Sequence, residues 1–351
     1  MTILAGDLGG TKTLLAIYSE DKVPVKVHHR KYISAEWASI EPMIKNFLKT
    51  LPNDIAYPKA GCLAVAGRVF KGDVTITNLS WKINEKELSK QIRINQLELI
   101  NDFAVLIYGL NFLNSDQYVE IRNQRKRNNS SNGVIAIIGA GTGLGIAKGF
   151  FTEDNIISIP SEGGHREFSP RSQLEWNLTS WLKDDLNLER LSIERIVSGT
   201  GLGHISRWLL AQDKESKHPL KEISDEWKTS GYKSHDLPAL ACRAAKNGDL
   251  VMKKAIDIWL SAYGSAAGDL ALEELCQEGL WIAGGTAIKH LEGFNSSIFL
   301  KAMSNKGRFQ SYIENLPLKA LIDPQAGLFS AACRARLLLH PDGKLRTIER
   351  K

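Results

Sequence analysis

Three glycine-rich turns, each directly after a short apolar run, constrain this chain more than any other feature of its sequence. They are DLGGTK at 7–12, GAGTGLG at 139–145 and AGGT at 283–286. Apolar residues with strand character also follow the first two turns, so we expect strand, turn, strand at both places. Glycine allows a close approach of the backbone, and the N–H groups of such turns can bind anions.

Two common phosphate-binding motifs do not fit these turns. A P-loop needs GxxxxGK[ST], but here only Thr11 separates Gly10 from Lys12, and no helical pattern follows. A dinucleotide fingerprint needs GxGxxG before a helix, whereas GAGTGLG has Leu144 at the last glycine position and precedes a strand pattern. Each turn alone could be a tight hairpin. Two of them, each with a threonine beside glycine, favour a clamp for a nucleotide.

The rest of the chain alternates helical and strand patterns. We expect strands at 62–67 and 97–102, a hairpin turning at Gly72-Asp73, and an Asn/Ser-rich surface loop at 122–133. The polar stretch 211–237 is expected to be an exposed excursion. Helices are expected at 36–50, 84–92 (with Asn84 as N-cap), 249–276 and 326–339. The apolar face of the third comprises Val251, Ala255, Ile258, Trp259, Ala262 and Ala266.

Composition narrows the class of protein. With 351 residues, 43% of them hydrophobic, the chain can form two domains. The net charge of +6 is scattered, which suits anionic ligands but does not indicate a nucleic-acid partner. Its four cysteines are far apart, so a zinc site or disulfide framework is not expected. Without a signal peptide or an apolar run of about 18 residues, we expect a cytoplasmic protein with no membrane partner.

Further motifs occur in a consistent order along nearly the whole chain. They are TNLSW at 77–81, LINDF at 99–103, SEGGHREF at 161–168, ERIVSGTGL at 194–202, GRF at 307–309 and QAGLFSAA at 325–332. Together with the glycine turns, they resemble bacterial glucokinases of the non-repressor type, within the actin, hexokinase and heat-shock ATPase superfamily. The resemblance implies an α/β fold of two actin-like (ribonuclease H-like) domains flanking a cleft. It implies a small domain of residues 1–110 plus 326–351 and a large domain of 111–325.

The resemblance also implies a reaction, the ATP-dependent phosphorylation of glucose at its 6-hydroxyl to give glucose 6-phosphate. Asp102 would be the general base. From its spacing alone, Asp102 could equally cap a strand end, Glu194 could be a surface helix residue and His165 a loop residue. A metal at His165 is poorly supported, since no second His or Cys lies at ligand spacing. The implied sugar contacts are Asn101, Asp102, Glu162, His165 and Glu194, with Asn78 a weaker candidate.

On the nucleotide side the resemblance implies ATP and Mg²⁺ as cofactors. Asp7 would hold Mg²⁺ through water, because Mg²⁺ keeps several of its waters in proteins. The β- and γ-phosphates would meet Gly9, Gly10, Thr11 and Lys12, the β-phosphate would meet Thr142 and Gly143, and adenosine would border Gly284 and Gly285. The chain departs from the family pattern at Lys12 (Asn in some relatives), Ser161 (often Gly) and Thr200 (often Pro).

Two other functions are weighed against this one. The first is a kinase for another hexose or an N-acyl hexosamine, from the repressor–kinase group. That group usually has a cysteine-rich zinc motif near its histidine, whereas no cysteine lies between Cys62 and Cys242. The second is a non-catalytic sugar sensor, which we would expect to have lost Asp102 and to carry a DNA-binding motif before the first turn, where six residues stand. The resemblance further implies a homodimer.

Overall fold

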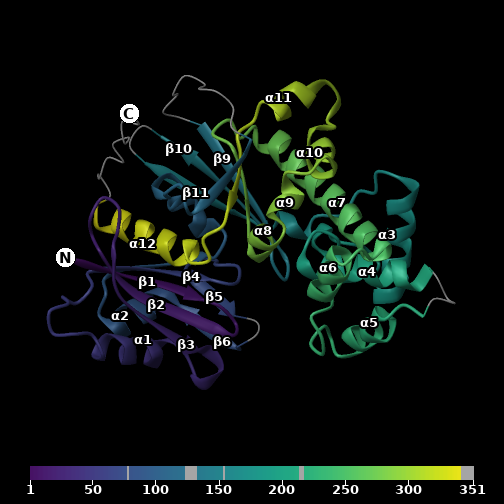
Figure 1. The fold of residues 1–351 in the computed structure, drawn as a ribbon. Coiled ribbons are helices and arrows are strands. Elements are labelled where there is room, and N and C mark those ends of the chain that lie inside the picture. Colours follow the sequence, from purple (N-terminus) through teal and green to yellow (C-terminus); the bar gives the residue numbers. More distant parts are fainter. Residues whose placement is uncertain (77–78, 123–132, 153–154, 213–216, 341–351) are drawn as a thin grey trace.

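The computed structural model describes residues 1–76, 79–122, 133–152, 155–212 and 217–340. The chain folds into a mixed α/β structure with two large sheets (Figure 1). The first sheet has the strand order β3-β2-β1-β4-β7. Strand β1 is antiparallel to β2 and parallel to β4, which is parallel to β7. The strands are β1 Thr2–Leu8, β2 Lys12–Ser19, β3 Lys26–Ile33, β4 Ala60–Val65 and β7 Gln96–Asn101.

The second sheet repeats this topology, with the order β11-β10-β9-β12-β13-β8. An antiparallel β9-β10-β11 unit is followed by the parallel strands β12 and β13, as β1-β2-β3 is followed by β4 and β7. This duplication confirms the expected pair of actin-like halves. The strands are β8 Tyr118–Arg122, β9 Gly133–Ala140, β10 Leu144–Phe151, β11 Ile156–Ser161, β12 Leu280–Ala283 and β13 Leu318–Leu321.

The glycine turns occupy equivalent places in the two sheets. The first joins β1 to β2 and the second joins β9 to β10, which confirms the expected strand–turn–strand units. The third follows β12 and leads into the short helix α8 (Gly285–Lys289). There Gly284 has φ of 85°, a left-handed conformation that glycine adopts without strain. Each turn therefore follows a central strand of its sheet.

Helices cover both faces of the first sheet. Alternate side chains of β1 and β2 pack on α1 (Ile40–Lys49) and α2 (Glu85–Ile92) on one face and on α12 (Ala326–Leu339) on the other. Helix α2 begins as predicted, with Asn84 Oδ1 accepting the N–H of Glu87 at 2.9 Å. Helix α1 begins four residues later than predicted, after a 3-10 turn at Ser34–Glu36. Figure 1 shows α12 (yellow) lying between the two sheets.

A small two-stranded sheet corrects the predicted hairpin at 72–73. Phe70 and Asp73 form a single bridge around that turn, whereas the extended pairing joins β5 (Asp73–Ile76) to β6 (Trp81–Asn84). Trp81 is 4% exposed and belongs to the core of the first sheet.

The largest core lies between the second sheet and a group of helices around α7. Helix α7 spans Leu250–Glu274 within the predicted range, with Trp259 and Tyr263 fully buried. Val251 was wrongly placed on its buried face, because it is 37% exposed and Met252 is buried beside it. The other helices are α3 Gln173–Leu186, α4 Gly199–Gln212, α5 Leu220–Thr229, α6 Leu237–Lys246, α9 Leu291–Phe294, α10 Ser297–Ser304 and α11 Gln310–Glu314.

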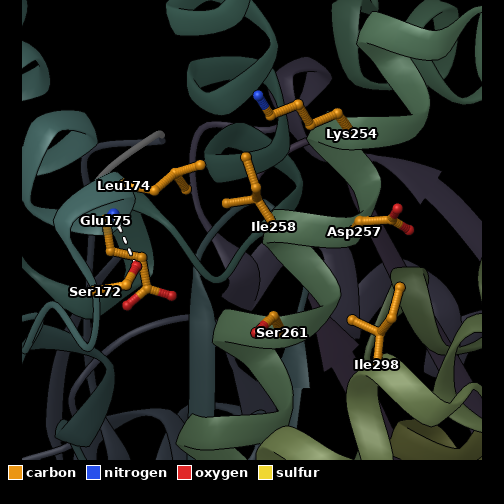
Figure 2. A pocket seen from close by; sticks show the side chains of 8 residues that line it. All are labelled: Ser172, Leu174, Glu175, Lys254, Asp257, Ile258, Ser261 and Ile298. Atoms are coloured by element: carbon orange, nitrogen blue, oxygen red, sulfur yellow. Dashed lines mark hydrogen bonds between the residues drawn. The ribbon is translucent and has the colours of Figure 1, made fainter.

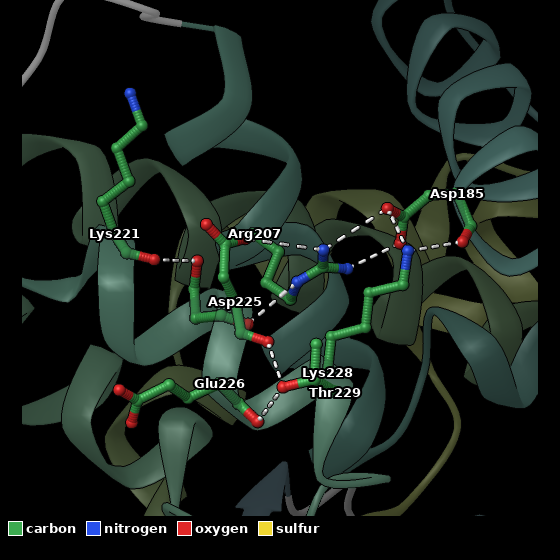
Figure 3. Close-up of polar contacts among 8 residues, drawn as sticks. Asp185, Arg207, Lys221, Asp225, Glu226, Lys228 and Thr229 are labelled. Carbon is green, nitrogen blue, oxygen red and sulfur yellow. Dashed lines mark hydrogen bonds and ion pairs between the residues drawn. The ribbon is translucent and has the colours of Figure 1, made fainter.

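The prediction of an exposed excursion at 211–237 was wrong for the inner face of α5, although many of the described residues of this stretch are exposed. Helix α5 buries Trp227, 2% exposed, against Gly203 of α4. Figure 3 shows Arg207 and Lys228 converging on Asp185, at 2.6 and 2.7 Å. The stretch is polar overall, but its few apolar residues recur at helical spacing, which is sufficient to anchor one face. Most of the expected loop at 122–133 lies outside the described residues.

Helix α12 contacts both halves of the molecule. It packs on β1 and β4 through Leu328 and Ala331, while Cys333 and Leu337 join a cluster with residues of the second sheet. The domain division at 1–110 plus 326–351 and 111–325 stays a prediction. Across the described part of the chain, no helix combines the length and apolar character needed to cross a bilayer.

Candidate active site

Asp102 stands directly after β7, at the edge of the first sheet. Its N–H donates to Val65 O at 3.0 Å, which ties it to the end of the neighbouring strand β4. Burial, together with the negative charges of Asp7 and Glu162, raises the pKa of the Asp102 carboxyl to about 6, against backbone N–H bonds that lower it. A carboxylate with a pKa near neutrality can accept a proton from a hydroxyl group under ordinary conditions.

Asn101 fixes one oxygen of this carboxylate. Its Nδ2 donates to Asp102 Oδ1 at 3.0 Å and to Gly67 O at 3.3 Å. Its Oδ1 accepts the N–H groups of Phe103 and Ala104, both at 3.0 Å. Asn101 therefore caps the turn after β7, and Oδ2 of Asp102 is the oxygen not engaged by this amide.

Phe103 joins this strand end to the second glycine turn, a contact that sequence reasoning missed. A Cβ built on Gly139 would lie 2.5 Å from the Phe103 ring, and one built on Gly145 would overlap three ring atoms. Two glycines of GAGTGLG thus make room for the ring that follows Asp102. The signal lay in the LINDF motif, where an aromatic residue follows the acid, but the partner could not be read from the sequence.

Asp7 lies at the end of β1, close enough to Asp102 for its charge to raise that residue's pKa. Burial raises the pKa of Asp7 itself. One or two carboxylates beside substrate phosphates are the usual protein contribution to a Mg²⁺ site. The described residues contain no group of three or more His, Cys, Asp or Glu suited to a metal ion. Asp7, a carboxylate beside the first glycine turn, is of the kind that makes this contribution.

Glu162, His165 and Glu194 come together from two separate loops. His165 Nε2 lies 3.8 Å from Glu162 Oε2, and its Nδ1 lies 3.4 Å from Glu194 Oε1. Glu162 and His165 are each 58% exposed, so they can meet a ligand, while Glu194 is 21% exposed. Such a set of acceptors and donors is suited to hydroxyl groups.

Backbone hydrogen bonds join these two loops to each other, and the side chain of Glu194 contacts the second turn. Ile193 N donates to Arg166 O at 2.8 Å, and Phe168 N donates to Leu191 O at 2.9 Å. A Cβ on Gly143 would lie 2.7 Å from Glu194 Oε2, so this carboxylate touches the turn predicted to hold phosphate. The predicted sugar and phosphate residues thus adjoin at Glu194. Asn78 lies outside the described residues.

The first glycine turn is closed by its own bonds and by Ser34. Gly9 N donates to Lys12 O at 3.0 Å, Ser34 Oγ donates to Gly9 O at 2.9 Å, and Ser34 N donates to Thr11 O at 3.1 Å. Thr11 and Lys12 are exposed, whereas Ser34 is fully buried. The role of Ser34 was missed because this residue lies before helix α1 and outside the motifs that pointed to the site.

The second and third turns lie against each other. Thr286 Oγ1, directly after Gly284 and Gly285, donates to Ala140 O at 2.7 Å. Gly199 N donates to Gly141 O at 2.8 Å, and Thr200 Oγ1 donates to Thr142 O at 2.9 Å. The residues predicted for β-phosphate and adenosine are therefore neighbours, although well over a hundred residues separate them in the sequence.

Two hollows lie away from these groups. A shallow groove of about 350 Å³ lies between α3, α7 and α10, and Figure 2 shows the side chains that line it, among them Glu175, Lys254 and Asp257. A second, of about 360 Å³, lies behind the His165 loop and is lined by Arg166, Asp269 and Glu273 among others. Neither is lined by a residue predicted to bind sugar or nucleotide.

Comparison with known proteins decides the family. The model of the family described as Glucokinase matches residues 4–338. A glucokinase of Synechocystis sp. is 36% identical over 357 residues, covering 96% of this chain and 98% of its own. The chain belongs to the glucokinase family. The crystal structure of glucokinase from an Antarctic psychrotroph has a TM-score of 0.79 at 28% identity, covering 95% of this chain and 98% of that one.

More distant glucokinases share the fold. The ROK family glucokinase from Streptomyces griseus, solved in complex with glucose and AMPPNP, has a TM-score of 0.56 at 16% identity, covering 96% of this chain and 99% of that one. At this identity the likeness concerns the fold alone. The family membership and the shared fold confirm the resemblance seen in the sequence.

Proposed function

We propose that this protein transfers the γ-phosphoryl group of ATP to the 6-hydroxyl of glucose. The observation that carries the proposal is the position of Asp102, a half-buried carboxyl with a pKa of about 6 joined through Phe103 to the second glycine turn. The name of the curated relative and the glucose and ATP analogue in the Streptomyces griseus structure support it.

In the proposed reaction Asp102 Oδ2 accepts the proton of the 6-hydroxyl. The sugar oxygen forms a bond to the γ-phosphorus while the bond from that phosphorus to the β–γ bridging oxygen breaks, and ADP leaves with the electron pair. Asn101 holds Oδ1 of the carboxylate, and its amide does not engage Oδ2. Glu162, His165 and Glu194 orient the remaining hydroxyls, which brings the reacting hydroxyl close to Asp102.

The two glycine turns would hold the phosphates and the third would border the adenosine. Gly9, Gly10, Thr11 and Lys12 act on one side and Thr142 and Gly143 on the other. Gly284 and Gly285 lie next to the second turn, as the contacts of Gly284 and Thr286 with Ala140 support. Mg²⁺ held through water by Asp7 would neutralise charge on the phosphates. We also propose that the protein is cytoplasmic and a homodimer.

The test is a phosphorylation panel on the purified protein with Mg²⁺-ATP. The sugars are glucose, mannose, fructose, N-acetylglucosamine and N-acetylmannosamine. The proposal requires turnover on glucose well above that on the N-acyl sugars. Turnover mainly on an N-acyl hexosamine would replace the assigned substrate, and ATP binding without turnover on any sugar would indicate a sensor.

A further inference from the structure

Four consecutive carbonyl oxygens of the second glycine turn, those of residues 140–143, are engaged by the protein. Ala140 O accepts from Thr286 Oγ1 and Gly141 O from Gly199 N, at 2.7 and 2.8 Å. Thr142 O accepts from Thr200 Oγ1 and Gly143 O from Gly141 N, both at 2.9 Å. Two of these four donors are threonine hydroxyls, from the starts of α8 and α4.

This pattern determines which way the N–H groups of the turn point. In a trans peptide the C=O of one residue and the N–H of the next point in opposite directions. With Gly141 O and Thr142 O bonded to the start of α4, the N–H groups of Thr142 and Gly143 face away from that helix. A Cβ built on Gly141 would meet nothing within 4 Å, so there is room beside the turn.

The first glycine turn is built in the same way by an unrelated residue. The hydroxyl of Ser34 donates to Gly9 O, so the N–H of Gly10 points away from Ser34. Ser34 is fully buried and also meets Thr13 Oγ1 at 3.0 Å, so its hydroxyl is held in place. In each of the two turns, which belong to different sheets, a carbonyl oxygen thus accepts a hydrogen bond from a hydroxyl group.

We propose that Ser34, Thr200 and Thr286 are positioning residues that hold the two turns with their N–H groups directed at the phosphates of the nucleotide. The inference rests on the proposed function, because it takes ATP as the ligand of both turns.

The test is binding of the ATP analogue AMPPNP by calorimetry, with glucose saturating, to the full chain and to the variants S34A, T200V and T286V. Losing one such bond should raise the dissociation constant about two- to tenfold per variant. The KM for ATP should rise with it, while the KM for glucose stays within about twofold of the original, a change too small to reflect a lost hydrogen bond. The variants T200S and T286S keep the hydroxyl and should bind as the original chain does.

The matched control is T179V, which removes a similar bond, from Thr179 Oγ1 to Glu175 O at 2.8 Å, within α3. It should leave AMPPNP binding unchanged. Equal weakening in T179V, or a KM for glucose that rises as much as that for ATP, would overturn the inference. Normal AMPPNP binding by all three variants would do the same. If the variants lose AMPPNP binding but the original chain phosphorylates no sugar, the inference stands and the proposed function fails.

Discussion

The contact between Phe103 and Gly145 gives a sharp prediction for the variant G145A. A methyl group at this position would overlap Cγ, Cδ2 and Cε2 of the Phe103 ring, so the ring has to move. Added atoms in a packed site of this kind typically cost about 1–3 kcal/mol of stability. The catalytic consequence should be larger than the loss of stability, because Asp102 is the residue next to Phe103.

A displacement of about 1 Å at the reacting groups can cost on the order of 10²-fold in rate. We therefore expect G145A to lower kcat for glucose phosphorylation by about 10²-fold while the KM for ATP changes little. The assay is steady-state production of ADP at saturating glucose and ATP, together with a thermal unfolding curve for each variant. Circular dichroism at the assay temperature separates misfolding from a displaced base.

A second substitution tests the cause. In the double variant G145A/F103L the smaller side chain leaves room for the methyl group, and activity should recover at least tenfold over G145A alone, since the coupled pair is not additive. Full activity in G145A would refute the argument that Phe103 positions Asp102. An equal loss in G145A and in the double variant would show that the ring is not the reason.

Three further predictions follow from the carboxylates. Glucose phosphorylation should fall as pH drops below about 6, where Asp102 is protonated, seen in kcat/KM against pH. Because burial raises its folded pKa, Asp102 destabilises the fold increasingly as pH rises from its unfolded pKa of about 4 to about 6, and by the full amount above that. D102N should therefore raise stability by up to ~3 kcal/mol at pH 8 and by little at pH 4. Despite burial, hydrogen bonds and charges of Arg207 and Lys228 lower the pKa of Asp185. Asp185 should therefore stabilise the fold above its unfolded pKa of about 4, and this contribution should fade in more acid solution. Melting curves of D185N, compared with those of the original chain at each pH, should lack this contribution.

The strand–turn–strand units were predictable because their signal is local. Apolar runs that end in glycine pairs determine both the strand and the turn, and the structure has them at 7–12 and 139–145. Helix α2 was predictable for the same reason, since Asn84 caps it within three residues. The family motifs then predicted which residues lie near the site.

What could not be predicted depends on contacts between distant segments. Ser34, Thr200 and Thr286 act on carbonyl oxygens of turns elsewhere in the chain, and a hydroxyl group gives no local sign of its acceptor. The excursion at 211–237 was judged by its polar average, whereas the packing of α5 depends on a few residues such as Trp227. The contact of Phe103 with Gly145 likewise joins two sheets that no short pattern relates.

The most direct test of this account is the rate of glucose 6-phosphate formation by the D102N variant with saturating Mg²⁺-ATP and glucose. The account predicts a loss of about 10²–10⁴-fold relative to the original chain, the usual contribution of a general base, with glucose binding largely retained. A D102N variant that forms glucose 6-phosphate at the original rate would contradict the assignment of Asp102 as the base, and with it the proposed mechanism.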